Sequence, residues 1–209
     1  MDTEKKDEVL AEERILTAAI EEFTQKGFAG ARMQAIADRA NISKSALHYY
    51  YRHKERLFKL VLDKTAGRTL NKIHLDMSGL EGFQEKFEYG FRFYYQTIYK
   101  NIKVVNFVFM ELKRNPAMIS DFLQESDIPD WIKSLNLELE KEYQAGRIHQ
   151  ISAQQLILNI VSLCLFPHLG GGIVTQVLDI DSDGYKQMLK EREESLFQFI
   201  KAALFIEEK

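Results

Sequence analysis

The N-terminal part of this chain is organised by residues 32–54, which run RMQAIADRANISKSALHYYYRHK. The pattern predicts two short helices separated by a tight turn at residues 41–43, Asn-Ile-Ser. Asn41 tolerates a positive φ better than most residues other than glycine, and Ser43 is a favourable N-cap for the second helix. Both helices then turn an inner face toward one small core, formed by Ile36, Ala37, Ala40, Ile42, Leu47 and Tyr50.

Two short helices at this spacing are typical of the helix-turn-helix that binds DNA. Ala37 is small enough to let the helices approach closely, and the turn begins four residues after it. The outer face of the second helix carries side chains that can hydrogen-bond base edges, namely Lys44, Ser45, His48 and Tyr49. A solvated helical hairpin without a binding role is the alternative interpretation of the same pattern.

The charge of this region favours an anionic partner. Residues 26–59 contain eight Lys or Arg and two Asp or Glu, a net charge of +6 in a chain whose total is −3, so the remaining residues carry −9. A basic patch on an acidic protein is a localised anion-binding surface. DNA fits this surface best. The rival hypothesis is an all-α interaction protein that uses the basic module on an acidic protein or a membrane surface.

The motif itself resembles a known family. Residues 42–51, ISKSALHYYY, followed by KERLF at residues 54–58, are similar to the signature of the tetracycline-repressor (TetR) family of transcription regulators. Residues 14–28 fit that family's first helix. Asn41 stands where the family usually has Gly, His48 where it often has Tyr, and His53 where Ser often caps the next helix. The resemblance implies a homodimeric repressor that binds a palindromic operator and is released by a small effector bound in its C-terminal half.

Eight residues are predicted to contact DNA. The N-terminal end of the second helix enters the major groove, with Lys44 placed to contact guanine. Ser45, with His48 or Tyr49, is expected to make further base or methyl contacts. The resemblance implies phosphate contacts from Tyr50 and Lys54, to which we add Arg32. The predicted set is therefore Arg32, Ser43, Lys44, Ser45, His48, Tyr49, Tyr50 and Lys54.

Length and composition limit the function classes. The chain has 209 residues, of which 45% are hydrophobic, and Cys164 is its only cysteine, so neither a disulfide within the chain nor a cysteine metal cluster is expected. The N-terminus carries no apolar signal region and no apolar run reaches transmembrane length, which predicts a soluble, cytoplasmic protein. We find no nucleophile–base constellation, no histidine pair at helical spacing and no phosphate loop. An enzyme, a metal site and a cofactor are therefore not expected.

The remaining sequence predicts an all-α fold of about nine helices. We expect a helix-turn-helix DNA-binding domain at residues 1–53 and a ligand-binding and dimerisation domain, a helical bundle, at residues 54–209. The helix that starts at Lys54 begins in the first domain and runs to about residue 72, so it is expected to link the two mechanically. Outside residues 32–72, helices are predicted at residues 10–26, 80–99, 103–113, 117–125, 129–146, 152–166 and 183–205.

Aromatic residues are concentrated in the predicted C-terminal domain. They recur at three- to four-residue spacing, as in an ordinary helical core or in the lining of an apolar ligand cavity. The family resemblance implies the cavity, for a mostly apolar effector of aromatic or acyl type, with Tyr94, Tyr95 or Asn106 as polar contacts. The candidate wall residues are Phe87, Phe91, Tyr94, Tyr95, Phe107, Met110, Trp131, Leu163 and Phe166.

Residues 153–166 are apolar around more of the helix circumference than one core contact requires. We therefore expect this helix and the last one to form a two-fold dimer, which would space the two DNA-contacting helices about 34 Å apart, one turn of DNA. The predicted interface residues are Leu156, Ile160, Leu163, Leu189, Leu196, Phe197 and Ile200.

Overall fold

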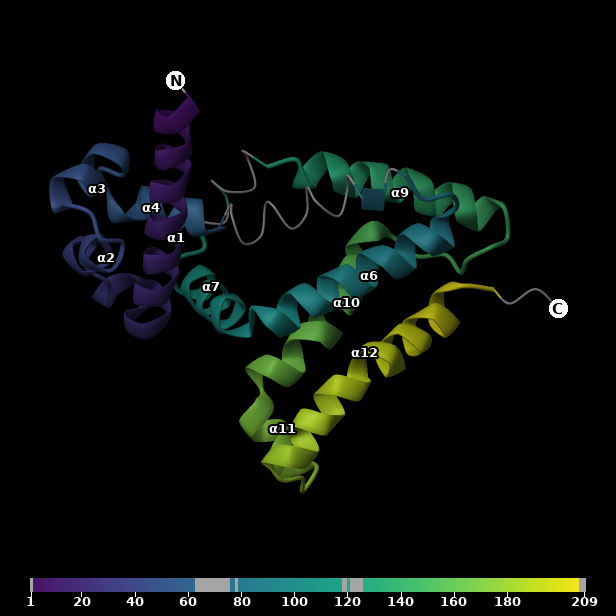
Figure 1. The fold of residues 1–209 in the computed structure, drawn as a ribbon. Helices are drawn as coiled ribbons and strands as arrows, with labels where there is room; N and C mark the ends of the chain where they lie inside the picture. Colours follow the sequence, from purple (N-terminus) through teal and green to yellow (C-terminus); the bar gives the residue numbers. More distant parts are fainter. Residues whose placement is uncertain (1, 63–75, 78, 118–119, 121–125, 207–209) are drawn as a thin grey trace. The chain divides into compact units, whose positions relative to one another are not determined.

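The computed structural model describes residues 2–62, 76–77, 79–117, 120 and 126–206. These residues form ten helices and no β-strand (Figure 1), which confirms the all-α class. They fall into two compact units: unit 1 takes residues 1–69 and 103–125, and unit 2 takes residues 70–102 and 126–209. The predicted helix at residues 117–125, and the part of the predicted linking helix after residue 62, lie outside the described residues.

Unit 1 is built around a long first helix. Gly27 adopts φ 69° and ψ 168°, a conformation that glycine adopts readily, and it kinks the helix at the predicted position. Phe28 then returns to the core, with its ring centroid 5.9 Å from that of Phe23 and 5.3 Å from that of Phe58. The helices of this unit are α1 (Asp2–Gly30), α2 (Met33–Arg39), α3 (Lys44–Tyr50), α4 (Lys54–Leu62) and α7 (Ile102–Arg114).

Two helices of unit 1 lie outside the predicted first domain. Four residues of α4 are buried in the unit 1 core: Leu57, Phe58, Val61 and Leu62. From α7, Phe107 is stacked parallel to Phe23 at 5.7 Å and meets Phe58 edge-on at 5.5 Å. The expected boundary between residues 53 and 54 therefore cuts through this compact unit, because α4 and α7 complete its core.

Unit 2 has a core rich in phenylalanine. Phe197 of α12 lies 6.4 Å from Phe87 and 5.6 Å from Phe91, both on α6, measured between ring centroids. Helix α6 contacts α10 and α12, and α10 also contacts α9. The helices of this unit are α6 (Phe83–Lys100), α9 (Ile128–Gln144), α10 (Ala153–Leu169), α11 (Gly171–Val177) and α12 (Ser182–Leu204).

Helix α10 begins as predicted, since the Ser152 hydroxyl accepts a hydrogen bond from the Gln155 N–H at 3.3 Å. It continues through Pro167 to Leu169 and is then followed by α11 after a bend of 80°. The Tyr185 hydroxyl donates to the Pro167 carbonyl at this bend. No single described helix is long and apolar enough to cross a membrane; α10 and α11 reach that length and composition only when taken together across the bend.

Candidate nucleic-acid interface

The turn between α2 and α3 has the predicted geometry. Asn41 has φ 54°, and the Ile42 N–H donates to the Ala37 carbonyl at 3.1 Å. The Ser43 hydroxyl accepts from the Ala46 N–H at 3.0 Å, which is the N-cap contact expected at the start of α3. Leu47 is fully buried beneath α3. These local contacts fix the orientation of α3 relative to α2.

The outer face of α3 carries the predicted base-contact residues. Lys44, Ser45 and Tyr49 are exposed, with Tyr49 at 83% of its full accessibility. Lys44 forms no ion pair or hydrogen bond with any residue that the structure describes. Ser45 Oγ lies 2.9 Å from Ser43 Oγ, so its hydroxyl also supports the start of the helix. Three of the predicted contacts are thus available to DNA on one short helix.

His48 has a defined hydrogen-bonding polarity. Its Nδ1 lies 3.3 Å from the backbone carbonyl oxygen of Arg52. A carbonyl oxygen only accepts hydrogen bonds, so Nδ1 carries the proton and Nε2 of the neutral ring is an acceptor. A phosphate oxygen is also an acceptor. Neutral His48 therefore suits an amino group of adenine or cytosine in the major groove better than it suits a phosphate.

Two tyrosines follow at the end of α3, with different surroundings. Tyr50 is 38% exposed, and its ring meets that of Tyr49 edge-on with centroids 5.6 Å apart. Tyr51 is half-buried, and its hydroxyl donates to Glu12 of α1 at 3.4 Å. Burial and then the Glu12 charge raise the pKa of Tyr51 to about 12. Tyr50 remains a candidate phosphate contact, whereas Tyr51 anchors the end of α3 to α1.

Lys54 lies closer to the protein than a dedicated phosphate contact would. Its Nζ donates to the carbonyls of Ala29 at 3.2 Å and Ala31 at 3.1 Å, and it sits 4.7 Å from the centroid of the Phe28 ring. An ammonium group has three donors, so one is left for a phosphate. The structure therefore gives Lys54 a second role that the sequence did not suggest, which is to satisfy carbonyls at the end of α1.

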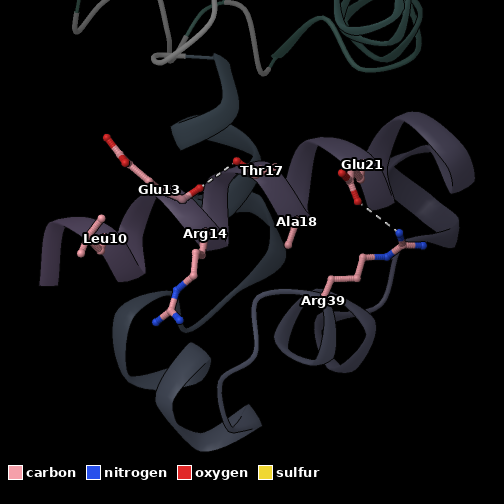
Figure 2. Close-up of a pocket in the computed structure, with 7 residues that line it drawn as sticks. All are labelled: Leu10, Glu13, Arg14, Thr17, Ala18, Glu21 and Arg39. Atoms are coloured by element: carbon pink, nitrogen blue, oxygen red, sulfur yellow. Dashed lines mark hydrogen bonds and ion pairs between the residues drawn. The ribbon is translucent and has the colours of Figure 1, made fainter. Parts of the chain in front are cut away.

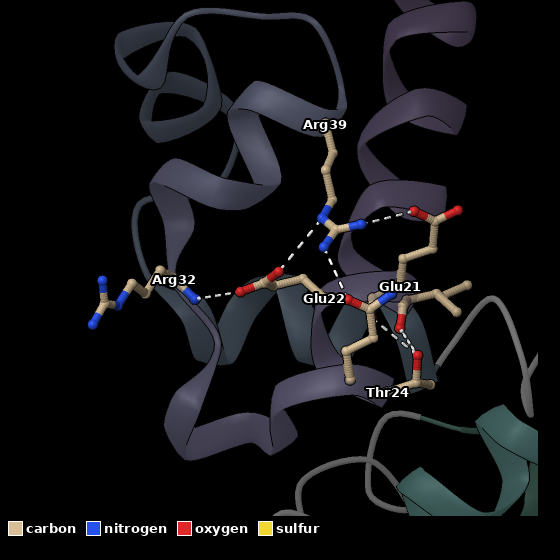
Figure 3. A network of polar contacts seen from close by, with 7 residues as sticks. Glu21, Glu22, Thr24, Arg32 and Arg39 are labelled. Carbon is tan, nitrogen blue, oxygen red and sulfur yellow. Dashed lines mark hydrogen bonds and ion pairs between the residues drawn. The ribbon is translucent and has the colours of Figure 1, made fainter.

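A buried carboxylate holds α2 against α1 (Figure 3). Glu22 is only 4% exposed, and its carboxylate lies 3.5 Å from Arg39 Nε and accepts from the Arg32 backbone N–H at 3.4 Å. Arg39 also reaches Glu21 at 3.3 Å and the Gln25 side-chain oxygen at 2.9 Å. The Arg32 side chain stays exposed. Sequence reasoning missed Glu22; the available signal was a glutamate next to Phe23 on the apolar stripe of the first helix.

An open depression of about 620 Å³ lies along α1 (Figure 2). Its lining carries both charge signs and includes none of the eight predicted DNA contacts. It is therefore distinct from the predicted recognition surface. The lining residues are Leu10, Glu13, Arg14, Thr17, Ala18, Glu21 and Arg39.

The predicted ligand residues do not all come together. Phe87, Phe91 and Tyr95 are buried in the unit 2 core, and Tyr94, Trp131 and Leu163 are half-buried in that unit. The other three predicted residues lie elsewhere. Phe107 packs in the unit 1 core. Met110 lies on α7 of that unit and is 48% exposed. Phe166 is 58% exposed. Asn106 belongs to unit 1 as well.

The predicted dimer residues are mostly internal. Five of them are buried in the protomer, so they are not available to a partner: Leu156, Leu189, Leu196, Phe197 and Ile200. Ile160 and Leu163 are half-buried and pack against the same core. The exposed apolar residues of these helices lie at other positions, with Leu158 at 57%, Phe166 at 58% and Phe199 at 65%. Apolar periodicity alone did not show which of these residues are buried within the protomer.

Comparisons with known proteins agree with this geometry. Residues 15–61 match the family described as bacterial regulatory proteins, tetR family. Over 73 residues, 35% of this chain and 38% of the relative, the chain is 36% identical to the HTH-type transcriptional repressor SCO4008 of Streptomyces coelicolor. It is 37% identical over 73 residues, 35% of this chain and 31% of the relative, to the HTH-type transcriptional regulator RutR of Escherichia coli K12. The match thus spans about a third of the length of these curated relatives.

The whole fold also has a counterpart among solved structures. The transcriptional regulator FadR from Bacillus subtilis in complex with stearoyl-CoA matches with a TM-score of 0.62 and 16% sequence identity, covering 84% of this chain and 96% of that one. This likeness concerns the fold alone. The family match covers the second half of α1 and reaches nearly to the end of α4, including the α2–α3 helix-turn-helix. The region that contains the helix-turn-helix, residues 15–61, is therefore similar to the tetR family of bacterial regulatory proteins.

Proposed function

We propose that this chain is a ligand-responsive transcriptional regulator, acting as a repressor that binds a palindromic operator as a homodimer. The observation that carries the proposal is the outer face of α3, where Lys44, Ser45 and Tyr49 are exposed on a basic module. A surface that binds anions only by charge needs no such residues, whereas base recognition does. A regulator of this kind acts on chromosomal DNA in the cytoplasm.

The dimer is proposed to form through the exposed apolar face of α10 and α12. Leu158 and Phe166 are eight residues apart on α10 and therefore share one side of that helix, with Ser162 between them. On α12, Phe199 is followed one turn later by the small, exposed residues Ala202 and Ala203. Apolar and small residues of this kind favour close packing of two helix pairs across a two-fold axis.

The effector is proposed to bind within unit 2. The stearoyl-CoA bound to the FadR neighbour agrees with an apolar molecule of acyl type, as the aromatic content of unit 2 also suggests. Release from DNA requires that the effector bind one conformation of the dimer better than the other, because equal affinity for both shifts nothing. Helix α6 belongs to unit 2 and α7 to unit 1, and only Asn101 separates them in the chain. A change at α6 is thereby covalently linked to the unit that contacts DNA.

A gel-shift assay tests DNA recognition. The purified protein would first select duplexes from a randomised pool, and the selected duplex would then compete against random DNA. We expect an inverted repeat to be enriched and the selected duplex to resist competition, with affinity that falls as salt rises. A protein that uses the basic module only for its charge would bind both DNAs alike, and that result would favour the rival interaction protein.

A further inference from the structure

Arg192 of α12 replaces a helical hydrogen bond that is missing in α10. Pro167 has no N–H, so it leaves the Leu163 carbonyl, four residues earlier, without its helical donor. Arg192 Nη2 supplies that donor at 3.0 Å. The guanidinium is thereby held between α10 and α12, where its Nε is buried and has no hydrogen-bond partner. A buried donor on a charged group is costly to leave unpaired, so a missing acceptor is the natural explanation.

The charge of Arg192 is also uncompensated. Among the residues that the structure describes, no carboxylate lies within ion-pair distance of it. The acidic side chains that follow it on α12 are engaged elsewhere: Glu194 lies 2.8 Å from Arg92, and Glu193 lies 3.7 Å from the same guanidinium. Arg92 is paired with Glu88 as well, at 2.8 Å. Of the arginines of unit 2, Arg92 and Arg147 are paired with carboxylates, whereas the half-buried Arg192 has no anion among the described residues.

A second donor without a partner in the described part of the chain, the Tyr94 hydroxyl, belongs to a residue packed against the same core. Arg192 Nη2 contacts the carbonyl of Leu163, the residue before Cys164, and Tyr94 packs against the core cluster that contains the buried Cys164. Burial raises the pKa of the Tyr94 phenol, and its hydroxyl has no hydrogen-bond partner among the described residues. The neighbouring Tyr95 hydroxyl, by contrast, donates to the Leu189 carbonyl at 2.9 Å. Two donors without acceptors thus lie around Cys164, one of them cationic.

Two other titratable groups of this region, His168 and Cys164, do not supply an anion. Burial, followed by the charge of Arg192, lowers the pKa of His168, which keeps this imidazole neutral at physiological pH. Burial raises the pKa of Cys164 to about 12, so the thiol is also neutral. The local charge at Cys164 is therefore positive.

We propose that unit 2 binds a carboxylate beside Cys164, with Arg192 Nε and the Tyr94 hydroxyl as its donors. A carboxylate has two acceptor oxygens, which match these two donors, and its charge compensates the guanidinium. The Tyr95 ring stacks on Phe91 at 6.2 Å, and Phe91 contacts Phe197, so the site borders the aromatic core. An alkyl carboxylate places its head at Arg192 and its chain along these rings. The inference rests on the proposed function, since it names the chemistry of the effector.

The test compares two probes that differ only in the head group, an anionic carboxylate with two acceptor oxygens or a neutral amide with one. Decanoate and decanamide have the same chain and a planar head, and their affinities for the full-length protein would be measured by calorimetry. We expect decanoate to bind at least about tenfold more tightly, because charge-assisted hydrogen bonds are the stronger ones. In Arg192→Gln, which retains an amide donor, this preference should disappear. In the matched control Arg92→Gln, which removes an arginine that already has carboxylate partners, it should persist.

Two further measurements keep the result independent of folding. Tyr94→Phe removes only the second donor and should reduce the preference for decanoate in part. Cys164 is the only thiol of the chain, so decanoate should slow its reaction with a thiol reagent in the wild-type protein and not in Arg192→Gln. Equal affinity for the two probes, no binding of either, or an unchanged preference in Arg192→Gln would overturn the carboxylate site. If decanamide released DNA as well as decanoate did, ligand-responsive regulation would stand and the carboxylate site would fall.

Discussion

Different kinds of interaction determine which apolar residues are buried in units 1 and 2. In unit 1, single residues at turns and helix ends fix the geometry: Gly27 at the kink, Asn41 at a positive φ, and Ser43 at the N-cap. In unit 2, α10 is apolar on most of its surface, and packing against α6, α9 and α12 decides which side is buried. Local chemistry thus determines the geometry of unit 1, whereas tertiary contacts determine which residues of unit 2 are buried.

The largest effect on stability is expected from a substitution in α7, the helix that completes the core of unit 1. Phe107→Ala should lower the free energy of unfolding by about 3–5 kcal/mol, because it removes a buried ring stacked on Phe23 and set against Phe58. Met110→Ala on the same helix should change it by less than about 0.5 kcal/mol, since Met110 is 48% exposed. Chemical denaturation of the two variants measures both values. Equal effects would show that α7 does not complete the core of unit 1.

The helix-turn-helix could be predicted from sequence because its signals are local. The turn, the N-cap and the inner positions Ile36 and Leu47 all follow from residues within a few positions of one another, and the structure confirms them. The unit to which Phe107 belongs could not be predicted in this way. A helical pattern shows which residues share a face, but it does not show which partner covers that face.

The candidate site likewise contains features that local sequence predicts and features that it does not. Exposure of Lys44 and Tyr49 follows from helical periodicity once α3 is placed. The second role of Lys54 depends on carbonyls of Ala29 and Ala31, more than twenty residues earlier, and no local pattern indicates it. The buried Arg192 Nε is likewise a consequence of Pro167 on another helix. Such contacts between distant segments require the folded structure.

A pair of phenylalanines on α12 tests the exposed face of unit 2. Phe199 is 65% exposed and Phe197 only 2%, although they are two residues apart. Phe199→Glu should shift the protein from dimer to monomer, with a loss of at least about 2 kcal/mol in association, because it places a charge in an apolar interface. Sedimentation over a range of concentrations measures the change. Phe199→Glu protein that remains fully dimeric would exclude this face.

Phe197→Ala is the matched control for that experiment. It should reduce the free energy of unfolding by about 3–5 kcal/mol through the cavity left in the protomer core. The dimer surface proposed at Phe199 would be preserved in the folded fraction. If Phe197→Ala caused the folded dimer to dissociate and Phe199→Glu had no effect, the interface would instead lie on the face that contains Phe197.

Substitutions of two lysines of unit 1 should distinguish base recognition from stabilisation of the fold. Lys44→Ala should relax specificity at one base pair, with a cost of about 1–3 kcal/mol on the selected duplex and little change on random DNA. Lys54→Ala should weaken binding to all duplexes and should also lower stability, because the carbonyls of Ala29 and Ala31 lose a charged donor. Binding titrations on both DNAs, with thermal unfolding in parallel, distinguish the two. Equal losses on selected and random DNA for Lys44→Ala would contradict its role in base recognition.

The smallest effect on stability is expected from an ion pair of unit 2. Its two residues are close in sequence, as are the residues that fix the turns of unit 1. Glu142, at the end of α9, accepts from Arg147 Nε at 2.6 Å and from Nη2 at 2.8 Å. The hydrogen bond from Arg147 lowers the pKa of Glu142. An ion pair with an exposed arginine is worth less than about 1 kcal/mol, so Glu142→Gln should cost no more than that at neutral pH.

The pH dependence of that cost identifies its source. Since the folded-state pKa of Glu142 lies below its unfolded value of about 4.3, the pair stabilises the fold above that pH, and the contribution is lost as pH falls through the folded-state pKa. The difference in unfolding free energy between wild type and Glu142→Gln should therefore be largest near neutrality and vanish in acid. Glu140→Gln, an exposed change on the same helix, should show no such dependence. A Glu142→Gln cost that stayed constant into acid would mean that packing of the side chain, and not its charge, holds the turn that follows α9.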